Sequence, residues 1–214
     1  RRVTDTVSPR RPRKDAAANR AGLLSAAART LALDPSASVD AIARAAGLSR
    51  RALYGHFDDR DALVRELVAS GAQRFNAIAT DPGLRLDTEP VPVALARLTG
   101  RLWGEASHVQ VAAAVALDER HVEDSAAALA PLRRALMNLV RRGQDEGTLR
   151  TDVAAPPLAR LIEETARTVI VRLDASSPEA HSLVVRAVLS IAGLSWRDAA
   201  ALIDAHSDVV GAAS

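Results

Sequence analysis

The sequence predicts an all-α protein made of two helical domains, and three observations lead to this prediction. Apolar residues make up 48% of the 214 residues and aromatic residues only 2%, so the core must be built from Ala, Leu, Val and Ile. Apolar positions recur with the period of a helix and show little strand-like alternation, which favours helices throughout. The sequence Asp81-Pro82-Gly83 then interrupts the pattern and marks the boundary between the two domains.

The N-terminal domain is expected to span residues 16–81 and to begin with three helices, of which the last two form a helix-turn-helix at residues 38–57. A serine before the second helix can cap it, and paired aspartates suit the positive end of a fourth. The expected helices are Ala16–Leu33, a second capped by Ser38, a third over Arg50–His56, and a fourth that opens at Asp58 and Asp59 and continues to the break.

The helix-turn-helix has an exposed basic face on its second helix. Gly47 lies at the turn, where a left-handed backbone conformation favours a residue without a Cβ, and Ser49 can cap the helix that follows. The exposed face presents Arg50, Arg51 and Tyr54, whose donors suit base edges and phosphates. This segment is therefore expected to bind double-stranded DNA.

Basic charge is concentrated beside this segment. The net charge is +2, but residues 1–20 hold seven basic and two acidic side chains and so carry +5, which leaves −3 for the remainder. Residues 1–15 are expected to form a flexible basic arm, because Pro9 and Pro12 discourage regular structure. Two interpretations stay open: a solvated tail, or an arm that follows a groove of the DNA.

The composition also limits compartment and chemistry. Cysteine is absent, which excludes thiol redox sensing and Cys-ligated metal sites. No apolar run is long enough to span a bilayer, and no signal-peptide pattern is present. We therefore expect a cytoplasmic protein with no membrane partner and no cofactor.

The C-terminal domain is expected over residues 92–206 as a series of amphipathic helices. The expected segments are Pro92–His108, a short apolar stretch at Val109–Leu117, Asp124–Glu146, Leu158–Leu173, a helix opened by Ser177-Pro178 that continues to Leu194, and a last helix through Ile203. The segment Asp124–Glu146 is either bent at Pro131 or begins there, and it ends at Gly147. Ser195 and Asp198 form a capping box for the helix that ends at Ile203.

Several short motifs carry a family resemblance. They are Ile42-Ala43, Ala46-Gly47-Leu48-Ser49, Leu53-Tyr54, His56-Phe57, Arg60 and Leu63. On these motifs the N-terminal part of the chain resembles the tetracycline-repressor (TetR) family of bacterial transcription regulators. The C-terminal part resembles the family only in layout, which includes the turn from Gly147 to Asp152. The resemblance implies a DNA-binding domain followed by a helical domain for ligand binding and dimerisation.

The resemblance also implies DNA contacts for seven residues: Ser38, Ser49, Arg50, Arg51, Tyr54, His56 and Arg60. Ser49 and the two arginines would enter the major groove, where arginine pairs with guanine, and the other four would contact phosphates. Taken alone, the arginine pair would be a solvated face and His56 a partner of the helix dipole. Ala52 stands where the family commonly has Thr, which leaves the identity of the operator open.

Further residues are implied in the C-terminal domain. Candidate effector contacts are Leu98, Leu102, Trp103, Leu136, Met137, Val140, Glu163 and Arg167. Candidate dimer contacts on the last long helices are Leu158, Ile162, Thr165, Val169, Val184, Val188 and Ile191. Core packing is the alternative for Trp103 and Met137, and pairing across a dimer is the alternative for Glu163 and Arg167.

These expectations combine into a homodimeric repressor that a small-molecule effector releases from a palindromic operator. The alternative is an effector-independent DNA-binding or architectural protein whose C-terminal half only dimerises. An enzyme is not expected, because neither a nucleophile elbow nor a Gly-rich phosphate loop is present. Glu119 and His121 lie two apart in an acidic cluster, and this spacing favours a solvated loop over a metal site.

Overall fold

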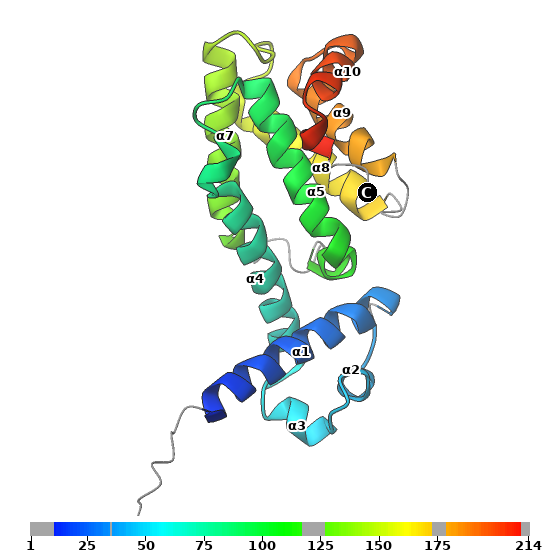
Figure 1. The fold of residues 1–214 in the computed structure, drawn as a ribbon. Helices are drawn as coiled ribbons and strands as arrows, with labels where there is room; N and C mark the ends of the chain where they lie inside the picture. Colours follow the sequence, from blue (N-terminus) through cyan, green and yellow to red (C-terminus); the bar gives the residue numbers. More distant parts are fainter. Residues whose placement is uncertain (1–10, 35, 117–126, 173–178, 211–214) are drawn as a thin grey trace, which may run out of the picture.

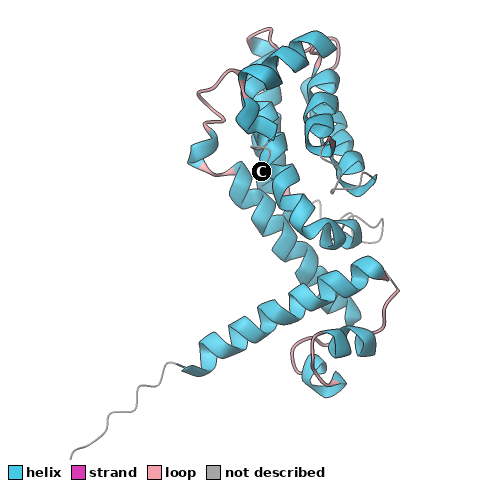
Figure 2. Cartoon of the chain, turned by 45° about the vertical axis from the view of Figure 1, so that its right-hand side comes forward, coloured by secondary structure: helices cyan, strands magenta, loops and turns pink. Residues whose placement is uncertain are grey.

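The computed structural model describes residues 11–34, 36–116, 127–172 and 179–210, and within these ranges every regular element is a helix (Figures 1 and 2). The predicted all-α fold is therefore confirmed. A small unit of α1, α2 and α3 lies at one end of α4, and the remaining helices form a larger body at the other end. No described helix is both long enough and apolar enough to cross a membrane.

The small unit contains α1 (Arg11–Leu33), α2 (Val39–Ala45) and α3 (Arg50–Tyr54), and it packs on the first half of α4 (Arg60–Ala79). The helix α1 begins at Arg11, five residues before the predicted start at Ala16, so the predicted flexible arm is wrong for residues 11–15. Pro12 lies in the first turn of α1, where a proline loses no hydrogen bond that the helix would make. The core shared by the unit consists of Leu23, Ala27, Leu31, Ala37, Ile42, Ala43, Leu53, Phe57, Leu63, Val64, Leu67 and Val68.

The helix α4 belongs to both parts of the molecule. Its first half supplies Leu63 and Leu67 to the small unit, whereas its second half packs on α5 and α7 in the body. Asp59 caps its start, with a hydrogen bond of 2.6 Å from the Ala62 N–H to Oδ1. After α4 the chain turns through a short 3₁₀ helix, η1 (Pro82–Leu84), at the predicted break. The division into two domains at this break stays a prediction, because α4 packs both on the small unit and on the body.

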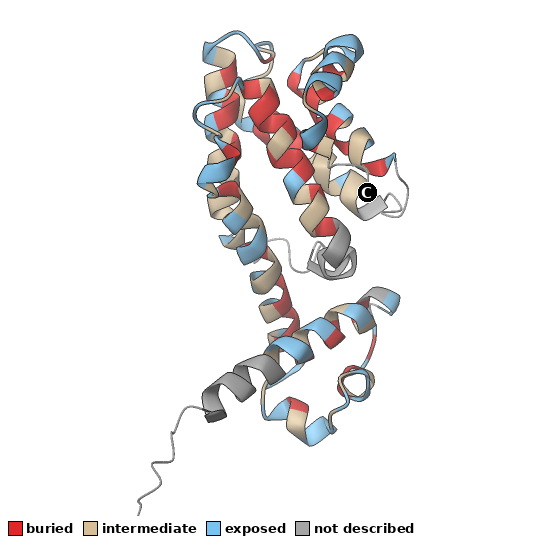
Figure 3. Cartoon of the chain, in the orientation of Figure 1, coloured by how far each residue is buried: buried red, intermediate tan, exposed pale blue. Residues whose placement is uncertain are grey.

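The body is built from α5 (Val91–Ala116), α7 (Ala130–Asp145), α8 (Ala155–Arg172), α9 (Ala180–Ala192) and α10 (Trp196–Ala205), followed by η3 (Ser207–Val210). Figure 3 shows that buried residues concentrate along the inner faces of α5 and its neighbours. The core of the body consists mainly of Leu, Val, Ile and Ala, as the composition predicted, with Trp103 as its largest member.

In the body, α5 differs from the prediction, and α7 decides between two predicted alternatives. The expected interruption between His108 and Val109 is wrong, because α5 continues unbroken to Ala116 and no proline or glycine separates the two segments. The helix α7 begins at Ala130 with Pro131 in its first turn and ends before Gly147, whose φ is +68°, so the alternative of a helix begun at Pro131 is confirmed. The acidic cluster with Glu119 and His121 lies outside the described residues, as do Ser177 and Pro178.

Candidate nucleic-acid interface and ligand cavity

The turn between α2 and α3 is fixed by local hydrogen bonds. Ser38 caps α2 through a bond of 3.3 Å from the Ala41 N–H, and Ser49 caps α3 through one of 3.2 Å from the Ala52 N–H. Between them Gly47 has a φ of +69°, and the Leu48 N–H donates to the Ala43 carbonyl at 2.8 Å. These contacts set the direction in which α3 leaves the turn.

One face of α3 is buried and the other lies in solvent. Leu53 is fully buried in the core of the small unit, whereas Arg50, Arg51 and Tyr54 are exposed. The structure therefore places the predicted arginine pair on the outer surface of the helix. Burial of Leu53 fixes which face of α3 points toward solvent.

Arg50 is held by two neighbours. Its Nε lies 3.3 Å from Asp40 Oδ1 on α2, and its guanidinium lies 5.5 Å from the centre of the Tyr54 ring. Hydrogen bonding to Tyr54, followed by the charge of Asp40, raises the pKa of Arg50 above its ordinary value, so the guanidinium is charged throughout the physiological range. The ion pair is exposed, and nucleic-acid acceptors can replace Asp40 at little cost.

The remaining residues of the predicted interface lie close to α3. Ser38 and Ser49 are exposed, and their hydroxyls are the helix caps described above. His56 is half-buried directly after α3. Arg60 begins α4, and its Nε donates to the Ala37 carbonyl at 3.3 Å, which braces α4 against the segment before α2. These residues surround one exposed face, and their predicted contacts with DNA stay a prediction.

Arg20 has a role that its charge alone does not indicate. Its Nε donates to Glu66 Oε1 at 2.6 Å, its Nη1 donates to the His56 carbonyl at 3.1 Å, and its guanidinium lies 4.7 Å from the centre of the Phe57 ring. The side chain thereby joins α1, the end of the helix-turn-helix and α4. Its partner Glu66 is 46 positions away, so no local pattern could reveal the contact.

The body contains a partly open cavity of about 110 Å³ between α4, α5, α7, α8 and α9. Its lining residues are Phe75, Leu95, Leu98, Thr99, Leu102, Leu129, Leu132, Arg133, Leu136, Ile162, Glu163, Ala166, Arg167, Ile170 and Val184. Five of the predicted effector contacts are among them, namely Leu98, Leu102, Leu136, Glu163 and Arg167. The wall is mainly apolar, and its composition is typical of a site for a small molecule.

Three predicted effector contacts do not line this cavity. Val140 is fully buried in the core of the body and Met137 packs against that core. Trp103 is 4% exposed and its ring centre lies 6.4 Å from that of His181. For Trp103 and Met137 the alternative of core packing therefore describes the structure, and Val140 also packs in the core of the body instead of the cavity wall.

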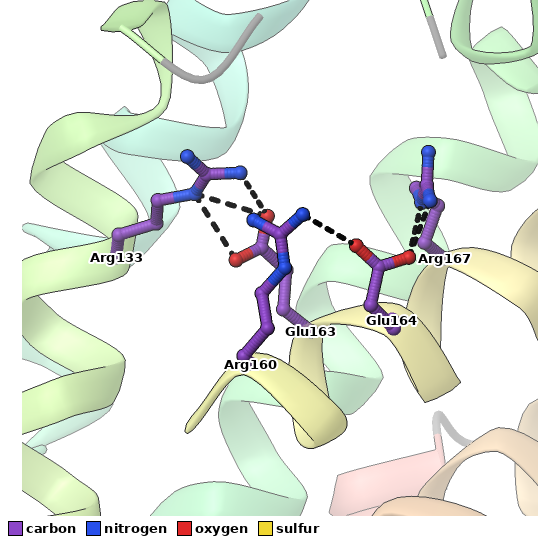
Figure 4. Close-up of polar contacts among 5 residues, drawn as sticks. All are labelled: Arg133, Arg160, Glu163, Glu164 and Arg167. Carbon is purple, nitrogen blue, oxygen red and sulfur yellow. Dashed lines mark hydrogen bonds and ion pairs between the residues drawn. The ribbon is translucent and has the colours of Figure 1, made fainter. Parts of the chain in front are cut away.

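Three arginine–glutamate contacts form a charged edge beside the cavity (Figure 4). Arg133 on α7 reaches across to Glu163 on α8, and its Nε lies 3.0 Å from each carboxylate oxygen. Arg167 donates from Nε to Glu164 Oε2 at 2.9 Å, and Arg160 lies 3.1 Å from the other oxygen of the same carboxylate. The alternative of pairing across a dimer is therefore unnecessary for Glu163 and Arg167, since both have partners within the chain.

The predicted dimer residues divide into two groups. Leu158, Ile162, Val184 and Val188 are buried within the single chain, at 0 to 3% exposure, and cannot form an interface. Their assignment to the dimer is wrong because a face buried in a core and a face buried in an interface have the same helical periodicity. Thr165, Val169 and Ile191 are partly exposed, and next to them Leu161 and Leu183 are each 47% exposed. We call these last five residues the α8–α9 face.

In the part of the chain that the structure describes, no group of three or more His, Asp or Glu side chains is arranged to hold a metal ion.

Comparison with known proteins agrees with this arrangement. Residues 23–67, which include α2, α3 and the start of α4, match the family model of bacterial regulatory proteins, tetR family. No curated protein sequence matches the chain.

Solved structures match nearly the whole fold. The TetR-family regulator PfmR from Thermus thermophilus has a TM-score of 0.68 at 20% identity, over 79% of this chain and 96% of that chain. FadR from Bacillus subtilis, in complex with stearoyl-CoA, has a TM-score of 0.65 at 13% identity, over 81% and 97%. LfrR from Mycobacterium smegmatis, in complex with proflavine, has a TM-score of 0.65 at 19% identity, over 84% and 97%. At these identities the similarity establishes the fold.

Proposed function

We propose that this chain is a member of the TetR family of bacterial regulatory proteins, that it represses transcription as a homodimer on a palindromic operator, and that a small molecule releases it. The observation that carries the proposal is the outward orientation of Arg50 and Arg51 on a helix capped by Ser49. Guanidinium groups bind guanine in the major groove and phosphates along its edges. In this proposal Ser49 and the arginines enter the groove, and Ser38, Tyr54, His56 and Arg60 hold phosphates.

Two copies are needed because a single helix-turn-helix buries too little surface for specific binding. Two α3 helices about 34–36 Å apart, or a multiple of this distance, would fit successive major grooves on one side of the duplex. The α8–α9 face is the surface that we propose for the dimer contact, since it is the exposed apolar surface of two long helices. We propose Leu161 and Leu183 as dimer contacts in place of Leu158, Ile162, Val184 and Val188, which the sequence predicted but which are buried in the single chain.

The cavity is the proposed effector site. Phe75 lines the cavity on α4, and the start of the same helix follows α3 directly. A ligand that prefers one position of α4 would therefore change the position of α3 relative to its copy in the dimer. The complexes of FadR with stearoyl-CoA and of LfrR with proflavine support an effector role for this chain. Such coupling is typically worth about 1–3 kcal/mol.

A gel shift with the DNA upstream of the gene itself, combined with light scattering, tests the proposal. We expect a dimer at micromolar concentration and protection of two half-sites by one dimer. A monomer that still protects both half-sites would contradict the dimeric arrangement. The alternative of an effector-independent DNA-binding protein predicts that no small molecule raises the melting temperature, because only a ligand of the folded state does so.

A further inference from the structure

The interior of the cavity favours an apolar group. Its wall is mostly Leu, Ile, Val, Ala and Phe, and Thr99 is the one neutral polar side chain among the lining residues. The Thr99 hydroxyl donates to the Leu95 carbonyl of its own helix at 2.8 Å and so has no donor left for a ligand. The Thr99 oxygen can still accept one hydrogen bond, but a carboxylate placed in this part of the cavity would find no donor to replace its hydrogen bonds to water.

The size of the cavity limits the apolar group to a short chain. An engineered protein cavity of roughly 150 Å³ binds benzene, which has six carbon atoms. A cavity of about 110 Å³ therefore suits roughly four to six carbon atoms. Longer ligands would extend past Arg167 into solvent, because the cavity is open on that side.

The charged edge has an excess of positive charge at one defined place. The carboxylate of Glu163 is bound by Arg133 at both oxygens. The carboxylate of Glu164, in contrast, is shared by Arg160 and Arg167, so that among the described residues these two guanidinium groups have one carboxylate between them (Figure 4). Of these two arginines only Arg167 lines the cavity. The side chain of Arg167 is 35% exposed, so it lies where the cavity meets solvent.

We propose that the cavity binds a small apolar molecule with a single anionic group, whose hydrocarbon part fills the interior and whose charge pairs with Arg167. The inference rests on the effector role proposed above and defines the chemistry of that effector. A cation would meet Arg167 and would have to displace Arg133 from Glu163. A neutral molecule would leave the second guanidinium of the Arg160–Glu164–Arg167 group without a full charge partner.

The wild-type protein provides the first test, with three six-carbon probes of different charge. Melting temperatures are measured with hexanoate, hexan-1-ol and hexylammonium at equal concentration and matched ionic strength. We expect hexanoate to raise the melting temperature most, since it alone pairs with Arg167. An equal or larger shift with hexan-1-ol or hexylammonium, or no shift with hexanoate, would overturn the proposal.

Substitution of Arg167 provides the second test. Arg167→Met keeps a long apolar stem but removes the charge, and it should weaken hexanoate binding roughly tenfold while leaving hexan-1-ol binding unchanged. Arg134→Met is the matched control, because Arg134 is exposed on α7 and does not line the cavity. Unchanged hexanoate affinity in Arg167→Met would overturn the proposal even if the variant folds less well.

Two separate measurements test the proposed effector role and the proposed anionic chemistry of the ligand. A gel shift with and without hexanoate measures the first, and the probe series measures the second. Hexanoate that binds through Arg167 but leaves DNA binding unchanged would support the anionic ligand and contradict the effector role.

Discussion

Asn76 holds the backbone of Leu132 and so joins α4 to α7. Its Oδ1 accepts a hydrogen bond of 3.1 Å from the Leu132 N–H, and its Nδ2 donates one of 2.8 Å to the Ala128 carbonyl. The Leu132 N–H lies in the first turn of α7, where helix donors lack partners within the helix, and Ala128 lies two residues before the helix begins. The adjacent Phe75 and Leu132 itself line the cavity. A movement of α7 caused by a ligand would therefore reach the helix that follows the DNA-binding surface.

Loss of this contact should destabilise the fold. In Asn76→Ala the Leu132 N–H and the Ala128 carbonyl lose their partner, so we expect the free energy of unfolding to fall by about 1–3 kcal/mol. Denaturant unfolding followed by circular dichroism measures the change. Gln73→Ala, at an exposed position of the same helix, should alter stability by less than about 0.5 kcal/mol. Equal losses in the two variants would mean that the contact contributes nothing.

The turn between α2 and α3 should tolerate no side chain at position 47. A Cβ there meets no atom within 4 Å, so the effect of Gly47→Ala comes only from its φ of +69° and should cost about 1–2 kcal/mol. Gly22→Ala is the matched variant, since it also has open space but lies within α1. It should stabilise the protein by about 0.5–1 kcal/mol. Effects of the same sign would show that the turn is not held in this conformation.

The helix-turn-helix could be predicted from sequence because its determinants are local. Ser38, Gly47 and Ser49 act within a few residues of their own positions, and the structure shows each in the predicted cap or turn. The cavity could not be predicted in the same way. Its lining comes from five helices, and Ile162 and Val184 have the same periodicity whether they face a cavity or a partner subunit. The contact of Arg20 could not be predicted either, because Glu66 is distant in sequence.

Stability should fall at acid pH through His181. Burial lowers the pKa of His181 below 6.5, so the folded state takes up a proton less readily than the unfolded state does. The stabilising contribution is present above pH 6.5 and is lost as the pH falls below this value. Urea midpoints at pH 5 and pH 7.5 should therefore differ more in the wild type than in His181→Gln. An identical pH dependence in the two proteins would contradict this role of His181.

Charge on the α8–α9 face should separate the proposed dimer. Leu161→Glu and Leu183→Glu place carboxylates at positions that are 47% exposed in the single chain, so the monomer should remain folded. In a dimer the charges would be buried without partners, and we expect light scattering to report a monomer at micromolar concentration. Leu33→Glu is the control, because Leu33 is 90% exposed on α1 and lies outside this face. A dimer that persists in both face variants would place the interface elsewhere.

The central claim is that Arg50 and Arg51, which point outward from α3, bind the operator. The most direct test removes both side chains. Arg50→Ala/Arg51→Ala is compared with Arg134→Ala/Arg141→Ala, which removes equal charge from exposed positions on α7. Dissociation constants for the upstream DNA and for unrelated DNA are measured at one salt concentration. The loss of two base contacts, at about 1–3 kcal/mol each, should weaken specific binding at least about thirtyfold and reduce the preference for the upstream DNA. A double variant of α3 that still prefers the upstream DNA as strongly as the wild type would contradict the account.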